Sequence, residues 1–136
     1  MGLIPAAARL FVERGIAADV ADHHLHAGAP MWGPKGFAAG TVTPGAGVAP
    51  FVQWDGNAVW GATAYWAHLV ALGVDRGDVA DTLRAALEDL VRADGFREFY
   101  DGWSGEPGGA GEASGFTWPA LVLEMAANEH GGPGPS

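Results

Sequence analysis

The feature that most constrains the fold is a pair of adjacent helical patterns joined by a short turn. Residues 57–72 are apolar over most of a helical circumference, which predicts a helix buried on more than one side, and Asn57 is a favourable N-cap for it. Residues 78–93 carry a single apolar stripe, formed by Val79, Leu83, Leu87, Leu90 and Val91. With the turn GVDRGD between them, the two patterns predict an αα-hairpin.

The rest of the chain alternates between shorter helical patterns and irregular segments. Further helices are expected over residues 5–12, 17–25 and 116–127. Residues 28–50 and 95–115 are rich in glycine and proline, which predicts loops rather than strands. We therefore expect an all-α fold with one domain over residues 1–130 and a disordered tail over residues 131–136.

Charge and composition limit the partners of the chain. The formal net charge is −9 and only 7 residues are lysine or arginine, which opposes binding to nucleic acid or to anionic membranes. No apolar run has the length of a membrane span, the first residues do not resemble a signal peptide, and there is no cysteine. We therefore expect a cytoplasmic protein with no nucleic-acid or membrane partner.

Three histidines lie close together at the end of the expected helix 17–25. His23, His24 and His26 have no evident carboxylate frame around them, and cationic side chains are favourable at a helix C-terminus. We therefore expect neither a metal site nor a cofactor.

Two clusters of polar and aromatic residues stand just before apolar helical patterns. The first is FVQWDGNAVW, residues 51–60, and the second spans residues 96–118. Indole rings provide flat faces for stacking on a sugar, and amides and carboxylates provide hydrogen-bonding groups for its hydroxyls. We expect the two clusters to open onto a shared carbohydrate pocket, although the tryptophans would equally serve as core or hairpin packing.

Three motifs in this order resemble trehalases and the related six-hairpin glycosidases. The first motif is QWDGNAVW and the second is EFYD at residues 98–101. The third is a glycine-rich run with a glutamate, followed by GFTW at residues 115–118. The resemblance covers residues 45–127 well, and it implies that the chain is the C-terminal part of an (α/α)6 toroid.

The resemblance also implies a chemistry. It assigns the catalytic base of an inverting hydrolysis of an α-glucosidic bond to Glu98. It assigns substrate binding to Gln53, Trp54, Asp55, Asn57, Trp60, Tyr100, Glu112, Phe116 and Trp118. Pro119 and Ala120 depart from the family pattern, so the sugar is expected to be trehalose or a related glucoside.

In this family the general acid lies in a motif well N-terminal to the matched region, and that motif is not found in this sequence. We therefore expect little turnover by the chain alone, with the missing half of the toroid as a candidate partner. Two other interpretations stay open: a non-catalytic carbohydrate-binding domain that keeps the QWD motif without the acid, and a helical interaction module. Glu98 itself could instead be a solvated loop carboxylate.

Overall fold

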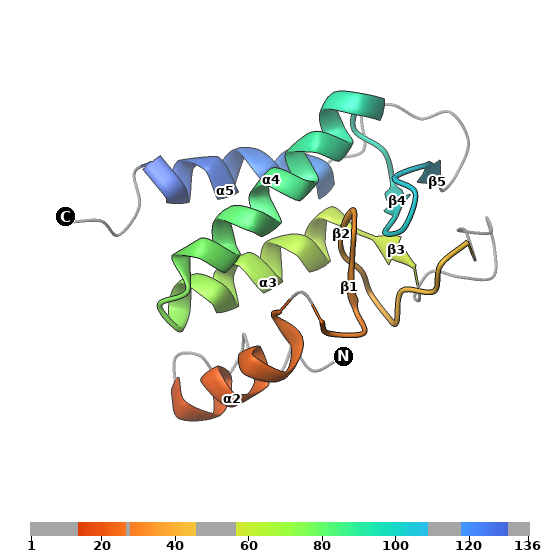
Figure 1. Cartoon of the computed structure of the whole chain (residues 1–136). Helices are drawn as coiled ribbons and strands as arrows, with labels where there is room; N and C mark the ends of the chain where they lie inside the picture. The colour runs from red at the N-terminus through yellow and green to blue at the C-terminus, as the bar shows by residue number, and fades with distance from the viewer. Residues whose placement is uncertain (1–13, 27, 46–56, 109–117, 131–136) are drawn as a thin grey trace.

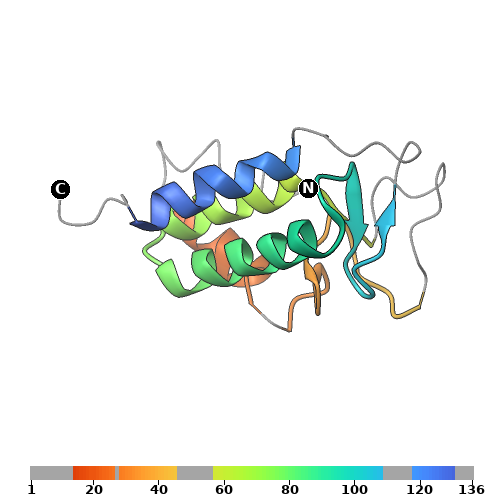
Figure 2. The ribbon, with the colours of Figure 1, turned by 90° about the horizontal axis from the view of Figure 1, so that it is seen from above.

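The computed structural model describes residues 14–26, 28–45, 57–108 and 118–130. Its helices are α2 (Arg14–His24), α3 (Gly61–Gly73), α4 (Gly77–Asp94), the 3-10 turn η1 (Trp118–Ala120) and α5 (Leu121–His130). Its strands are β1 (Trp32–Gly33), β2 (Gly36–Phe37), β3 (Ala58–Val59), β4 (Phe99–Asp101) and β5 (Pro107–Gly108). The helices pack side by side, and the short strands lie at one end of them (Figures 1 and 2).

The predicted αα-hairpin is confirmed. Helices α3 and α4 pack together and are joined by a turn in which Asp75 has a left-handed backbone, with φ of 62°. Helix α4 buries one face, formed by Ala80, Leu83, Leu87 and Leu90. Helix α5 packs against both members of the hairpin and α2 packs against α3, so α3 is the central helix (Figure 1).

The core lies between these helices and the strands. Its largest fully buried side chains include Leu25, which directly follows α2, Phe37 of β2, Leu83 and Leu87 of α4, Tyr100 of β4 and Met125 of α5. A buried polar link also joins the hairpin, because Nδ1 of His68 on α3 lies 3.1 Å from the carbonyl oxygen of Ala80 on α4. The core is therefore built from elements along most of the described chain.

The expectation of an all-α fold is wrong, and so is that of a toroid built only from helical hairpins. The described residues form two small antiparallel sheets beside the helices, a β1–β2 hairpin and a three-stranded sheet in the order β3-β4-β5. Both loops predicted to be irregular contribute strands. The strands have two or three residues each, which is too short for the alternation of apolar and polar residues that marks a strand in a sequence.

The central helix also begins later than predicted. Trp60, not Asn57, is the N-cap of α3, because residues 58 and 59 are extended and pair with β4. The other expected helices are confirmed as α2, α4 and α5, with ends that differ by a few residues. The expected helix 5–12 and the tail 131–136 lie outside the described residues. Within the described ranges, no helix combines the length and apolar character needed to cross a bilayer.

Candidate functional site

The pairing of β3 with β4 brings parts of the two polar-aromatic clusters side by side. Ala58 pairs with Asp101 and Val59 pairs with Tyr100, in an antiparallel register. Trp60 follows Val59 and contacts Phe99, which comes directly after Glu98 in the sequence. The residues that precede the central helix α3 therefore meet the residues that follow α4.

Trp60 and Phe99 form an aromatic contact at this junction. Their ring centroids are 4.9 Å apart and the ring planes are inclined at 45°. Phe99 is buried, whereas Trp60 is only partly buried. The indole of Trp60 therefore packs on the sheet and keeps part of its surface accessible.

Glu98 lies one residue before β4 and is partly buried. It is preceded by a short loop, residues 95–97, that leaves the end of α4 at Gly95, where φ is 78°. A carboxylate in this place can accept hydrogen bonds or a proton next to an aromatic surface.

Tyr100 is fully buried and its hydroxyl group closes this loop. The hydroxyl donates to the carbonyl oxygen of Gly95 at 2.5 Å and accepts from the backbone N–H of Arg97 at 3.2 Å. Burial raises the pKa of the Tyr100 phenol above its ordinary value. Tyr100 thus ties down the backbone that carries Glu98, and its hydroxyl has both of these protein partners.

We expect Tyr100→Phe to lower the free energy of unfolding by about 1–2 kcal/mol, because the Arg97 N–H and the Gly95 carbonyl lose a shared partner. The raised pKa also has a consequence at alkaline pH. The unfolded chain releases the phenolic proton first, so the stability from Tyr100 is present below about pH 10 and is lost as pH rises further. Urea unfolding of the wild type from about pH 8 to 11 should show this loss, and the variant should show a weaker one.

Tyr65→Phe is the matched control, because Tyr65 is a partly buried tyrosine on α3 rather than in the sheet. An equal change in the alkaline profile of both variants would contradict the role given to Tyr100.

Asn57 and Asp101 form a buried polar network under the junction. The Asn57 side-chain oxygen accepts from the Thr43 N–H at 2.6 Å, and its amide nitrogen donates to the Thr43 carbonyl at 2.8 Å and to Asp101 Oδ1 at 3.2 Å. Asp101 also accepts from the Trp103 N–H at 2.9 Å and from the Ser104 hydroxyl at 3.0 Å. The side-chain oxygen and nitrogen of Asn57 are thereby both bonded inside the protein, and the Asp101 carboxylate holds the turn that follows β4.

The other predicted site residues cannot be placed in this way. Gln53, Trp54, Asp55, Glu112 and Phe116 lie outside the described residues. Trp118 begins η1, and only its backbone is described. The structure thus brings together Asn57, Trp60, Glu98 and Tyr100 out of the predicted set.

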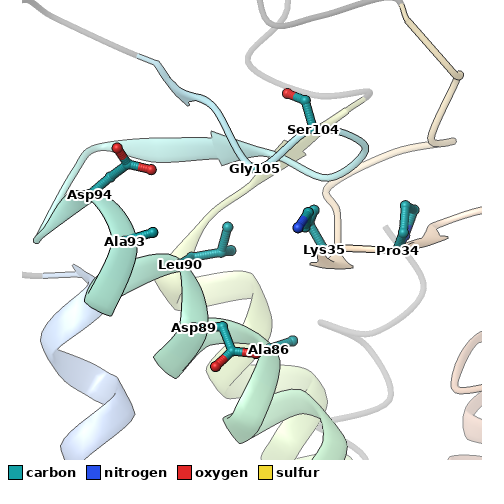
Figure 3. A pocket seen from close by; sticks show the side chains of 9 residues that line it. All are labelled: Pro34, Lys35, Ala86, Asp89, Leu90, Ala93, Asp94, Ser104 and Gly105. Carbon is teal, nitrogen blue, oxygen red and sulfur yellow. The ribbon is translucent and has the colours of Figure 1, made fainter.

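Two cavities formed by described residues lie elsewhere, and none of the described residues that line them was predicted as a site residue. One has a volume of about 190 Å³ and lies between α4, the β1–β2 turn and the turn at Ser104 and Gly105 (Figure 3). The other is an apolar groove of about 260 Å³ between α4 and α5, lined in part by Val91, Phe96, Val122 and Leu123. Lys35, the only lysine of the sequence, was the one signal that could have drawn attention to the first cavity.

The histidines at the end of α2 do not form a metal centre with other described residues. The rings of His23 and His24 lie edge to face with centroids 4.9 Å apart. The pKa of His24 is lowered from its ordinary value, mainly because the ring is partly buried and to a smaller extent because of electrostatic repulsion from His23. Among the described residues, no group of three or more histidine, aspartate or glutamate side chains is arranged to hold a metal ion.

Comparison with protein-family models, with curated proteins and with solved structures finds no match for this chain.

Proposed function

We propose that the chain carries the base half of a trehalase-like glycoside hydrolase site. The observation that carries this proposal is the antiparallel pairing of β3 with β4. It sets the end of the QWDGNAVW motif beside the EFYD motif, so that the partly accessible indole of Trp60 packs on Phe99, the residue that follows Glu98 in the sequence. The order of the motifs in the sequence supports the same reading.

In this proposal, Glu98 accepts a proton from a water molecule as that water attacks the anomeric carbon of a glucoside. The glycosidic bond breaks, and a separate acid protonates the leaving oxygen from the opposite face, with the two carboxyl groups about 6.5–9.5 Å apart. Trp60 offers its exposed surface to the sugar ring, as Trp118 would, while Gln53 and Asp55 would bind hydroxyl groups. No cofactor is required, and the substrate would be trehalose or a related cytoplasmic α-glucoside.

We expect the purified chain to bind such a glucoside without hydrolysing it appreciably, because the acid is supplied from outside these residues. Isothermal titration calorimetry with trehalose and other glucosides measures binding, and a glucose-release assay measures turnover. Trp60→Ala should weaken binding by about fivefold or more through the loss of a stacking surface. Glu98→Gln, which keeps the shape of the side chain, should leave binding within about twofold of the wild type.

Trp103→Ala is the matched control for Trp60→Ala, because Trp103 is an exposed indole of the β4–β5 turn and is 43% exposed. If the chain alone hydrolyses a glucoside, and Glu98→Gln abolishes this activity, the expectation that the general acid is missing would be contradicted. Binding that persists when the chain is completed by its missing half, still without turnover, would favour a non-catalytic carbohydrate-binding domain. Failure to bind any sugar would count against both readings.

One observation favours a second candidate function, that of a helical interaction module. Leu123 on α5 is 66% exposed and borders the apolar groove between α4 and α5. Exposed apolar surface of this kind is common at protein–protein contacts. Light scattering at increasing protein concentration tests this second function. A monomer at all concentrations would argue against self-association through the apolar groove between α4 and α5.

A further inference from the structure

We propose that the cavity between α4 and the β1–β2 turn binds a small zwitterion, a molecule of the size of a simple aliphatic amino acid with one ammonium and one anionic group. This inference goes beyond the glycosidase proposal and does not depend on it, because none of the described residues that line the cavity was predicted to bind sugar. The cavity was not anticipated from the sequence.

The first argument is the placement of charge. Asp89 and Asp94 stand on α4, and Lys35 stands across the cavity on the turn between β1 and β2 (Figure 3). Residues with carboxylate and ammonium groups therefore line the same cavity from different elements. A ligand with a cationic end toward α4 and an anionic end toward Lys35 would be complementary to both walls.

The second argument is that these charged groups have no ion-pair partner among the residues that the structure describes. Among the described residues, Arg76, Arg84 and Arg92 pair with carboxylates, and Arg97 donates to the carbonyl of Asp94. Lys35 has no carboxylate within 4.0 Å, and the carboxylates of Asp89 and Asp94 receive no hydrogen bond from the part of the chain that the structure describes. The charges of the cavity are thus available to a ligand.

The third argument is size and lining. Pockets for drug-sized ligands usually measure about 300–1,000 Å³, and this cavity of about 190 Å³ suits a smaller molecule. Leu90 and Ala86 give it an apolar wall, and none of its lining residues within the described ranges is aromatic. The lack of an aromatic lining disfavours a stacked sugar, whereas an apolar wall between opposite charges suits the methylene chain of an amino acid.

The shape of the Lys35 wall is also set by packing. Gly105 has φ of 83°, and a Cβ atom there would lie 3.4 Å from Leu90 Cδ2 and 3.5 Å from the Lys35 Cδ and Cε atoms. The Lys35 stem therefore lies against the Gly105 backbone, which limits the positions open to its ammonium group. A partly held side chain loses less entropy when it binds a ligand.

The test is a titration of the ¹⁵N-labelled full chain with 4-aminobutyrate, followed through the amide signals of Leu90, Ala93 and Gly105. Butylamine and butyrate, each with only one of the two charges, are the comparison probes. We expect saturable shifts at these amides with 4-aminobutyrate, and binding about fivefold or more weaker with either comparison probe.

Lys35→Met and Asp89→Asn should each weaken 4-aminobutyrate binding by about fivefold. Asp81→Asn is the matched control for Asp89→Asn, because Asp81 is an exposed aspartate of α4 that does not line the cavity, and it should bind like the wild type. Ala93→Leu should fill the cavity and remove the shifts, and its amide spectrum reports whether it is folded. Absence of saturable shifts at these amides, equal binding of butylamine, or equal losses in Asp81→Asn and Asp89→Asn would overturn the proposal.

Discussion

Replacing Gly33 by alanine should lower the free energy of unfolding by about 3 kcal/mol. A Cβ atom on Gly33 would lie 2.4 Å from the carbonyl oxygen of Gly102, a distance at which one of the two backbones must move. That same oxygen accepts a hydrogen bond from the Lys35 N–H at 2.9 Å, so the movement would separate the β1–β2 hairpin from the end of β4. Equilibrium urea unfolding followed by tryptophan fluorescence measures the loss.

Gly77→Ala is the matched control, because Gly77 is the first residue of α4 and a Cβ atom there meets no other atom within 4 Å. Alanine restricts the unfolded chain and favours the helix, so this variant should gain up to about 1 kcal/mol. Similar stability changes in Gly33→Ala and Gly77→Ala would contradict the close approach of β1 to Gly102.

Asn57→Asp should cost at least about 3 kcal/mol at neutral pH. The new carboxylate would be buried beside Asp101 and would lose the amide donor that reaches Asp101 at 3.2 Å and the Thr43 carbonyl at 2.8 Å. Asn57→Ala should cost about 2 kcal/mol, because it removes these bonds without adding a charge. The difference between the two variants should shrink as pH falls, because protonation of the introduced carboxylate removes its buried charge.

Chemical denaturation of both variants at neutral and acidic pH gives these values. Thr82→Ala is a control at an exposed site, because the Thr82 hydroxyl bonds only to the Asp78 carbonyl one turn earlier on α4. A pH-independent difference between Asn57→Asp and Asn57→Ala would show that Asp101 does not interact with residue 57 as the structure describes.

The α3–α4 hairpin was predictable because its signals are local. Helix α4 was expected over residues 78–93 and spans Gly77–Asp94, since five apolar side chains at helical spacing define one buried face. The sheets were not predictable, because strands of two or three residues depend on partners far along the chain. Asn57 illustrates the conflict: its side chain suits a helix N-cap, but its long-range bonds to Thr43 and Asp101 prevail.

Of the two candidate sites, one was predictable from the sequence and the other was not. The meeting of the QWDGNAVW and EFYD segments was expected from the order of the motifs, and in the structure it depends on the pairing of β3 with β4. The cavity at Lys35 could not be predicted, because it combines the β1–β2 turn, α4 and the β4–β5 turn. Nothing in the spacing of these three segments indicates that they meet.

The pairing of β3 with β4 also has a consequence for how this part of the chain folds. The two strands join the ends of a segment from Ala58 to Asp101 that contains the whole α3–α4 hairpin. Once the two helices are docked, the strands are already close, so little further loop-closure entropy is lost when they pair. We therefore expect the segment from Ala58 to Asp101 to fold as one cooperative unit, in which β3 and β4 pair after the two helices have packed together.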